Sequence, residues 1–344
     1  MRIIHLSDFH IASNSIKDTF NFIVEALVKD LAQYNNDKKI DLIIFSGDLI
    51  DKGGQRFESI EHAFSEFETY VASPLLEALN LSKEHFIFVP GNHDIDRNAD
   101  SHNTEIGLRS TLCNETAVSQ FIEDNKKNPD EIKRIIPFKN FERKYHLHTP
   151  NSEITNFHST YHYKYNNKEV GISAFNTAWR CYDSDHDNNN ILLGIKQAKE
   201  AKKQIEKTDF KIAVIHHQLD LLKDFDMEIV QPFMQREYDL VLCGHVHKGS
   251  SHKETSTYGD LLVSIAPSNT FNGVFAHDQR FFNGYSIIDF SFENNNFLVH
   301  HRMYSQNHDR YIANIELGPD DNGKVTYNKE TGNKSSNIQK KRMK

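Results

Sequence analysis

The sequence, 344 residues long, predicts an α/β fold in which polar residues follow the strands. Short apolar runs alternate with longer segments of helical periodicity over roughly the first 90 residues, and this alternation predicts a parallel sheet with right-handed crossovers. Five apolar runs are followed closely by aspartate, asparagine or histidine. Because ligands bind at the carboxyl ends of strands in open α/β sheets, we expect these side chains to converge on one site.

The first part of the chain shows the alternation most clearly. Apolar runs predict strands at residues 2–7, 42–45 and 86–89, and apolar residues at helical spacing predict helices at 16–34 and 56–79. Pro74 has no backbone N–H to donate, so the second helix is expected to be interrupted or kinked near it.

The pattern changes after residue 95. Residues 95–168 contain polar helical pieces near 115–126 and 130–145, and we interpret this segment as an insertion that packs near the site as a cap. Strand character then resumes in short runs, and the last three of these are expected to be antiparallel strands of a second sheet. The expected strands are 170–175, 212–215, 240–243, 261–265, 285–290 and 297–302, with a helix at 194–207.

The end of the sequence differs in composition from the rest. Residues 318–344 are rich in Asn, Gly, Lys and Ser, which is typical of a mobile tail or linker. We therefore expect one folded domain over residues 1–317 and a flexible basic tail that could connect to another domain or partner.

The overall composition favours a soluble cytoplasmic protein. The formal net charge is −8, and residues 318–344 carry seven Lys/Arg against three Asp/Glu, which leaves the remainder more acidic and disfavours a broad nonspecific nucleic-acid surface. Three widely spaced cysteines, Cys113, Cys181 and Cys243, indicate a reducing compartment. The sequence shows neither a secretory leader nor an apolar run approaching the roughly 18 residues of a membrane helix.

Two pairs of candidate ligands have a spacing that suits a shared cavity. Asp8 and His10 are separated by one residue, and so are His245 and His247. In an extended segment, positions i and i+2 point the same way, so both members of a pair can reach the same cavity.

Asp48, Asn92 and His216 follow three other apolar runs. A carboxylate can bridge two cations, and Asp48 is the natural bridge, while Asn92 offers a neutral carbonyl oxygen. Mixed His, Asp and Asn ligands suit Mn²⁺, Fe or Zn²⁺ better than Mg²⁺, which prefers oxygen alone. The candidate ligands include no cysteine, and substrate needs open metal positions, so a structural zinc site is a poor fit. We expect two divalent ions, with Mn²⁺ favoured.

His93 and Asp94 directly follow Asn92 and are the candidate catalytic residues. Two metal ions about 3.5–4 Å apart generate a hydroxide near neutral pH and neutralise a phosphoryl group during in-line displacement. The leaving alkoxide then needs a proton. We expect His93 to supply it as general acid, and Asp94 to orient His93 and raise its pKa.

Together, the ordered motifs resemble those of the calcineurin-like metallophosphoesterases. The motifs are Asp8-Phe9-His10, Gly47-Asp48, Gly91-Asn92-His93-Asp94, His216 and Gly244-His245-Val246-His247. The resemblance implies a four-layer αββα sandwich of two mixed sheets. It also implies one metal held by Asp8, His10, Asp48 and His247, and a second held by Asp48, Asn92, His216 and His245.

The residues that would contact substrate are less sharply defined. Of the adjacent histidines, the first usually matches the family ligand, which leaves His217 near the substrate. Asn92 is expected to contact substrate as well. Arg97 is expected either to clamp a phosphate or to form a salt bridge to the insertion. Trp179 could stack on a base or simply pack in the core.

The same motif set serves several activities. We favour a phosphodiesterase that acts on a cyclic nucleotide or a nucleic-acid strand. The alternatives are a phosphomonoesterase, including a protein phosphatase, and a binding module that keeps the fold without turnover. Nucleases of this family often have a histidine shortly after the Gly-Asp motif, where this chain has Leu49-Ile50-Asp51, and this difference disfavours a repair nuclease.

Overall fold

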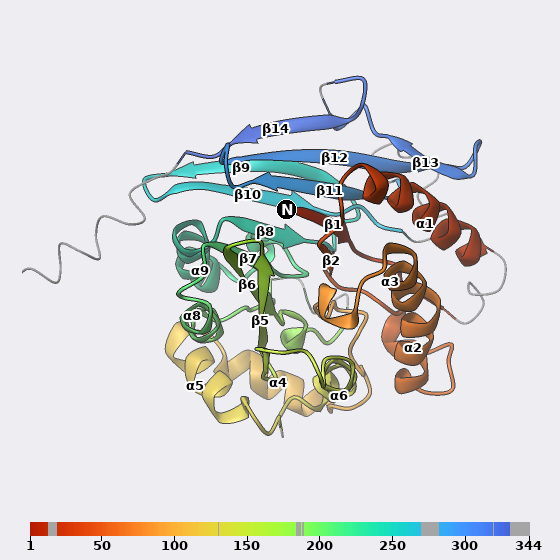
Figure 1. Cartoon of the computed structure of the whole chain (residues 1–344). Helices are drawn as coiled ribbons and strands as arrows, with labels where there is room; N and C mark the ends of the chain where they lie inside the picture. Colours follow the sequence, from red (N-terminus) through yellow and green to blue (C-terminus); the bar gives the residue numbers. More distant parts are fainter. Residues whose placement is uncertain are drawn as a thin grey trace, which may run out of the picture.

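The computed structural model describes residues 1–12, 19–129, 131–183, 187, 189–269, 282–318 and 320–330, without the side chains of residues 19–21. Within these residues, two seven-stranded mixed sheets pack against each other and helices cover their outer faces (Figure 1). This is the expected four-layer αββα sandwich.

The first sheet has the strand order β13-β12-β11-β1-β2-β3, and β14 also pairs with β12. β1, β2 and β3 are parallel, while β11, β12, β13 and β14 pair antiparallel with their neighbours. The strands are β1 (Arg2–Leu6), β2 (Leu42–Phe45), β3 (Phe86–Phe88), β11 (Gly284–Ser291), β12 (Asn296–Ser305), β13 (Arg310–Ala313) and β14 (Lys324–Asn328).

The second sheet has the strand order β4-β5-β6-β7-β8-β10-β9. Its central strands β6, β7, β8 and β10 are parallel, and antiparallel pairs lie at both edges. The strands are β4 (Glu153–Ile154), β5 (His158–Tyr165), β6 (Lys168–Phe175), β7 (Phe210–Val214), β8 (Leu240–Cys243), β9 (Ser250–Ser256) and β10 (Gly259–Ile265).

The helices form the two outer layers. The first sheet is covered by α1 (Thr19–Asp37), α2 (Ile60–Phe67), α3 (Ser73–Leu79) and α6 (Ile136–Tyr145), and the second by α5 (Glu115–Asn125), α8 (Ile195–Gln204) and α9 (Asp224–Glu237), with α4 (His102–Thr111) beside them. Short 3₁₀ turns occur at Lys52–Gly54, Lys83–His85, Lys133–Ile135, Ala178–Arg180 and Leu219–Leu221. In the described part of the chain, no helix is both long and apolar enough to span a bilayer.

Apolar side chains fill the space between each pair of layers. The middle cluster lies between the two sheets and includes Ile3, Leu42 and Ile172. The alternate residues Ile4 and Ile43 point away from it and pack against the helices on the first sheet. Because β2 is buried on both faces, its sequence is a continuous apolar run rather than an alternating one. β1 is also buried throughout, although it contains Arg2 and His5.

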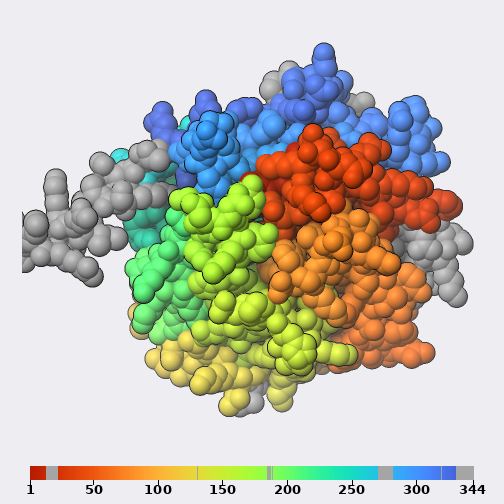
Figure 2. All heavy atoms as spheres, viewed as in Figure 1, coloured from red at the N-terminus to blue at the C-terminus, as the bar shows by residue number. Residues whose placement is uncertain are grey.

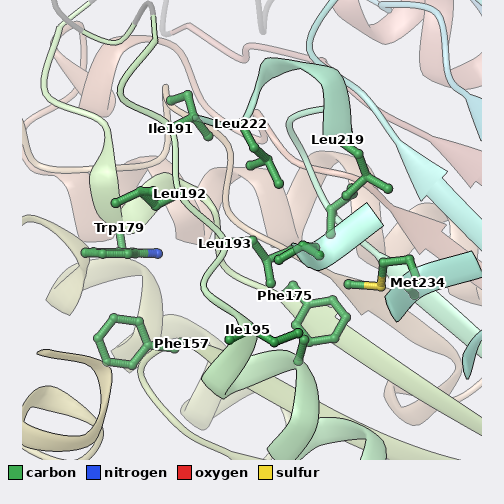
Figure 3. Close-up of a cluster of buried hydrophobic side chains, with 14 of the residues drawn as sticks. Phe157, Phe175, Trp179, Ile191, Leu192, Leu193, Ile195, Leu219, Leu222 and Met234 are labelled. Carbon is green, nitrogen blue, oxygen red and sulfur yellow. The ribbon is translucent and has the colours of Figure 1, made fainter. Parts of the chain in front are cut away.

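Trp179 belongs to the core beneath the helices of the second sheet (Figure 3). Its side chain is fully buried, with the Phe121 ring stacked at a centroid distance of 5.5 Å and the Phe157 ring edge-on at 5.4 Å. This packing settles the alternative that the sequence left open, because a buried indole offers no face to a nucleobase.

The interruption expected near Pro74 lies just before the proline. α2 ends at Phe67, a π-helical turn spans Glu68–Ala72, and α3 begins at Ser73. Pro74 cannot donate a hydrogen bond to the carbonyl one turn earlier, so the helix widens ahead of it. The residues at the start of the first expected helix, 16–18, lie outside the described part of the chain.

The expected insertion is shorter than residues 95–168. β5 pairs antiparallel with β6 along its whole length and so belongs to the second sheet. What lies between β3 and β4 is a set of helices that pack on the sandwich: Phe138 of α6 contacts Phe64 of α2 with ring centroids 5.8 Å apart.

Part of the expected tail belongs to the first sheet, so the domain extends beyond residue 317. β14 pairs with β12, with Val325 opposite Val299. The hydroxyl of Tyr327 donates a hydrogen bond to the carbonyl of Ser251 on β9 (2.7 Å), which ties β14 to the second sheet as well. Residues 331–344 of the expected tail lie outside the described residues.

Candidate metal centre

Five strands carry candidate ligands at their carboxyl ends. β1, β2 and β3 are parallel, and so are β7 and β8, so the carboxyl ends of each set lie on one edge of its sheet. Asp8 and His10 follow β1, Asp48 follows β2, Asn92 follows β3, His216 follows β7, and His245 and His247 follow β8. The structure brings these seven residues together.

Asp8, His10, Asp48 and His247 form the first group, with ligand atoms within 4.8 Å of one another. Asp8 Oδ1 lies 3.1 Å from His247 Nε2 and 3.6 Å from His10 Nε2. Asp48 Oδ2 lies 3.6 Å from His10 Nε2. Two carboxylates and two imidazoles thus surround a position that could hold one cation.

Asn92, His216 and His245 form the second group, again with Asp48. Asn92 Oδ1 lies 3.2 Å from His216 Nε2 and 3.1 Å from His245 Nδ1, and His216 Nε2 lies 3.3 Å from Asp48 Oδ2. His216 Nδ1 is 2.7 Å from the carbonyl oxygen of Ser46, which only accepts, so Nδ1 carries a proton and Nε2 is the ring nitrogen that faces the group. Asp48 lies between the two groups, as a bridging ligand would.

The closeness of the candidate ligand atoms, and the pKa of His216, indicate whether these residues fit a pair of cations. His10 Nε2 and His247 Nε2 lie 3.2 Å apart, a distance at which two imidazole lone pairs repel each other unless a cation or proton lies between them. Burial lowers the pKa of His216, but the adjacent Asp48 carboxylate outweighs it and raises the pKa to about 9. Both features show that the cluster favours positive charge at its centre, and the His, Asp and Asn donor set fits divalent transition metals.

Five candidate ligands have backbone φ angles in the left-handed region, which is uncommon for residues with a side chain. These are Asp8 (φ 55°), His10 (46°), Asp48 (56°), His245 (73°) and His247 (58°). Each residue thereby leaves its strand in a sharp turn that directs the side chain across the strand end. Strained residues of this kind cluster at functional sites.

Two glycines leave room for the ligands. A Cβ on Gly47, whose φ is 104°, would lie 2.4 Å from His216 Nδ1. A Cβ on Gly244 would lie 2.0 Å from Ser7 Oγ and 2.8 Å from Asp8 Oδ2. Any side chain at either position would displace a candidate ligand or its support.

His93 lies beside the first group, with its ring centroid 4.4 Å from that of His10. Its backbone N–H donates to Asp48 Oδ1 (2.8 Å), and its ring Nδ1 lies 3.0 Å from Asp51 Oδ1 and 3.2 Å from the backbone nitrogen of Lys52. The Lys52 N–H is directed at the same nitrogen, so Nδ1 can serve only one of the two contacts at a time. The shorter contact, to Asp51, places a proton on Nδ1, because an ionised carboxylate only accepts. Burial lowers the pKa of His93, but the Asp48 carboxylate and then the bond to Asp51 outweigh it and raise the pKa above its ordinary value.

Asp94 is placed differently from the expectation that it orients His93. Its two oxygens accept hydrogen bonds from the backbone N–H groups of Gly91 (2.8 Å), Ile50 (3.0 Å) and Leu49 (3.1 Å). Burial, followed by repulsion from Asp48, raises the pKa of Asp94 to about 7. Asp94 therefore joins the turns after β2 and β3, and the carboxylate that holds the His93 ring is Asp51, which the sequence analysis did not single out.

His217 is 1% exposed, and both of its ring nitrogens face protein atoms. Nδ1 lies 2.8 Å from Thr177 Oγ1, and Nε2 lies 3.7 Å from Cys181 Sγ. Burial lowers its pKa well below the ordinary value, so the ring is neutral. The ring packs 4.5 Å, centroid to centroid, from that of His245, which favours a supporting role over the expected contact with substrate.

Arg97 lies at the turn that carries Asn92 and His93. Its Nη2 donates to the backbone carbonyl of Asn92 (3.2 Å), and the residue is partly exposed. This contact fixes the turn and keeps the guanidinium beside the site. The salt bridge to the insertion that the sequence also suggested is not among the contacts of Arg97 within the described residues.

A family model for calcineurin-like phosphoesterases matches residues 1–249, which contain every candidate ligand. The chain belongs to the calcineurin-like phosphoesterase family. The cluster at the strand ends lies within the matched residues and is a candidate metal centre.

The chain is similar to two bacterial proteins that are themselves uncharacterised. It is 19% identical to the metallophosphoesterase-like protein YydB of Bacillus subtilis strain 168, over 92% of this chain and 62% of YydB. It is 37% identical to a metallophosphoesterase of Helicobacter pylori strain J99, over 27% of this chain and 20% of that protein. The chain thus spans less than two thirds of the length of these relatives.

Two solved structures are also similar. A dimetal phosphatase from Danio rerio has a TM-score of 0.48 at 10% identity, with 91% of this chain and 98% of that chain covered. The NAD nucleotidase NadN of Haemophilus influenzae has a TM-score of 0.41 at 10% identity, with 85% of this chain and 48% of that chain covered.

Proposed function

We propose that this chain is a phosphodiesterase whose substrate is a cyclic nucleotide or a nucleic-acid strand. When bound, a pair of divalent ions, Mn²⁺ first and Fe or Zn²⁺ as alternatives, supplies an activated water nucleophile and neutralises charge on the phosphoryl group. One ion would be held by Asp8, His10, Asp48 and His247, and the other by Asp48, Asn92, His216 and His245.

The observation that carries the proposal is the arrangement around His93. Asp51 accepts the proton on Nδ1, which leaves Nε2 as the ring nitrogen that can give a proton to the leaving oxygen of the substrate. The backbone of His93 is held by Asp48, so the acid has a fixed position relative to the candidate bridging ligand. Burial opposes the charged ring of His93, but the Asp48 and Asp51 carboxylates raise its pKa above the ordinary value, which favours the protonated form that a general acid requires.

The charges near His93 favour a diester over a monoester. A phosphate monoester carries close to two negative charges at neutral pH, because its second pKa is near 6, whereas a diester carries one. Among the described residues around His93, Arg97 and the exposed Lys52 carry positive charge, whereas Asp48 and Asp51 carry negative charge. Arg97 already donates to the carbonyl of Asn92. This balance suits a monoanion.

The experiment compares bis-p-nitrophenyl phosphate with p-nitrophenyl phosphate in the presence of Mn²⁺. We expect kcat/KM for the diester to exceed that for the monoester by at least about tenfold, a difference of about 1.4 kcal/mol in transition-state stabilisation. A clear preference for the monoester would make the chain a phosphomonoesterase instead. Turnover of neither substrate by a protein that holds two metal ions would support a binding module. A panel of cyclic nucleotides and single-stranded DNA and RNA then identifies the substrate class.

A further inference from the structure

A cavity of about 280 Å³ opens between α1 and the β12–β13 end of the first sheet. Figure 1 shows α1 lying alongside β13, and Figure 2 shows the red surface of the N-terminal helix meeting the blue surface of the C-terminal strands. None of the candidate metal ligands lines this cavity. Its polar and charged lining residues are Lys29, Asp30, Gln33, Arg302, Asp309 and Arg310, with Tyr311 beside them.

The negative charge of Asp30 is already satisfied within the protein. Arg302 donates to both carboxylate oxygens, from Nε to Oδ2 (2.9 Å) and from Nη2 to Oδ1 (2.7 Å), and the Tyr285 hydroxyl also donates to Oδ2. Arg302 Nη1 has no partner among the described residues. Asp30 and Arg302 thus form an ion pair that is neutral overall, while Arg302 Nη1 retains donor capacity.

The other lining residues leave an excess of hydrogen-bond donors. Lys29 Nζ lies 3.9 Å from a carboxylate oxygen of Glu25. The side chains of Gln33 and Arg310 have no hydrogen-bond partner in the described part of the chain. Asp309 is the opposing carboxylate, and it accepts a hydrogen bond from the Tyr304 hydroxyl (3.3 Å). Lysine and arginine donors around a small cavity suit a phosphate group.

A short hydrogen-bonded path leads from this cavity to the metal centre. Arg302 Nη2 donates to the Tyr311 carbonyl (3.0 Å), and the buried Tyr311 hydroxyl donates to Asn269 Oδ1 (2.8 Å). The backbone N–H of Asn269 donates to the carbonyl of Asp8 (3.1 Å), a candidate ligand with a left-handed backbone. A shift of Tyr311 would therefore reach Asp8 through one intervening residue.

We propose that this cavity is a second binding site, which takes a terminal phosphate group, and that its occupant changes the metal affinity of the centre through Tyr311 and Asn269. The phosphate group could be inorganic phosphate or the end of a phosphorylated small molecule. Binding at this site does not depend on the proposed phosphodiesterase activity, so the two proposals can fail separately.

Binding is tested by calorimetric titration of the full chain in EDTA, with inorganic phosphate in one arm and 5′-AMP in the other. The test variant combines Lys29→Glu with Arg310→Glu, and the control combines Lys203→Glu with Lys207→Glu, which makes the same charge change at exposed positions on and after α8. We expect one saturable site in the parent and the control, weakened at least about tenfold in the test variant. The probe that binds more tightly shows whether the site takes inorganic phosphate or the phosphate of a small molecule. No saturable site in either arm, or equal affinity in all three proteins, would overturn the proposal.

Coupling is tested by measuring the Kd of Mn²⁺ with and without the phosphate probe. Phosphate that binds directly at the metal centre affects all variants alike, so the comparison between variants isolates the cavity. We expect phosphate at the cavity to change the Kd of Mn²⁺ about fivefold, both in the parent and in the Lys203/Lys207 control. This change should be lost in the Lys29→Glu/Arg310→Glu variant and in Tyr311→Phe. The same phosphate effect in all four proteins would contradict the coupling.

Discussion

At the scale of single residues, the candidate centre combines backbone strain with dense hydrogen bonding. Five ligands hold left-handed φ angles, each of which costs of order 1–3 kcal/mol and persists only where the surroundings fix it. The surroundings here include the carboxylate of Asp94, which joins two of the turns, and the carbonyl of Ser46, which holds the ring of His216. The ligands are thus held in place by the protein itself.

Removing the proposed acid should separate chemistry from metal binding. We expect His93→Asn to retain both metal ions and to lose about 10²- to 10⁴-fold in kcat for a diester with a poor leaving group, the usual contribution of a positioned general acid. The loss should be smaller for p-nitrophenyl esters, because p-nitrophenolate leaves without a proton. Steady-state kinetics on the two kinds of substrate measure the difference. Unchanged rates with both would remove His93 from this role.

Asp51 should act only through His93. Asp51→Asn replaces the carboxylate that holds His93 Nδ1, so we expect a smaller loss of kcat than in His93→Asn. If the two residues act as one unit, the double variant should be no slower than His93→Asn alone, since linked residues are not additive. Additive losses in this double-mutant cycle would show that Asp51 has a separate function.

The sequence predicted the candidate ligands better than their supports. Candidate ligands such as Asp8 and His10 stand out because a metal site would restrict both the residue type and its place at a strand end. Asp51 carries no such pattern: it is a single carboxylate in a turn, and only the folded structure shows that its oxygen faces His93. For Asp94 the sequence indicated proximity correctly, but it could not show that backbone amides occupy both oxygens.

At the scale of elements, the strands buried on both faces were predicted closely and the polar strands were missed. β2 and β8 match their apolar runs residue for residue. β5 was not predicted, because His158–Tyr165 is rich in polar residues. Its alternate residues Tyr161, Tyr163 and Tyr165 nevertheless pack against the core between the sheets. α9 was not predicted, since Pro232 lies inside it and disrupts the helical pattern.

β14 should contribute to stability although it lies in the segment expected to be a tail. A chain that ends at Gly323 would lose this strand and expose the edge of β12, including Val299 of the core between the sheets. We expect its Tm to fall by on the order of 5 °C relative to a chain that ends at Glu330 and keeps the strand. Thermal melts followed by circular dichroism measure this. Equal Tm values would mean that β14 contributes nothing to the fold.

The buried histidines of the segment after α6 should make stability depend on pH. Burial lowers the pKa of His158 to about 3 and that of His146 to about 4, so both are neutral in the folded protein. An unfolded histidine gains a proton near pH 6.5, so acidification favours unfolding between that pH and the lowered pKa. Stability from these groups is therefore present above about pH 6.5 and decreases as the pH falls toward 4.

His158→Gln should remove the contribution of His158 to the pH dependence of stability. Between pH 7.5 and 5.5, the loss of unfolding free energy should be about 1.4 kcal/mol smaller than in the parent, the value for one proton taken up only by the unfolded state. Urea denaturation at the two pH values measures it, with His308→Gln at an exposed position as the control. An identical pH dependence in the parent and His158→Gln would contradict the neutral buried state.

At the scale of the whole molecule, the candidate centre joins the two sheets. Asp8, His10, Asp48 and Asn92 come from the first sheet, whereas His216, His245 and His247 come from the second. The αββα architecture could be expected because the ordered motifs resemble a family with that fold. The closeness of β9 and β14 could not be predicted from the sequence, and neither could the packing of the helices between β3 and β4. Both depend on contacts between residues far apart in the sequence.

The most direct test of the account is the metal content of the purified chain and of Asp48→Ala after equilibration with Mn²⁺. Asp48 Oδ2 lies within 3.6 Å of ligand atoms from both groups, so its removal should weaken both positions at once. We predict two ions per chain in the parent and in His93→Asn, and less than one in Asp48→Ala. Two ions still bound to Asp48→Ala would contradict the bridged pair of metals on which the proposed chemistry depends.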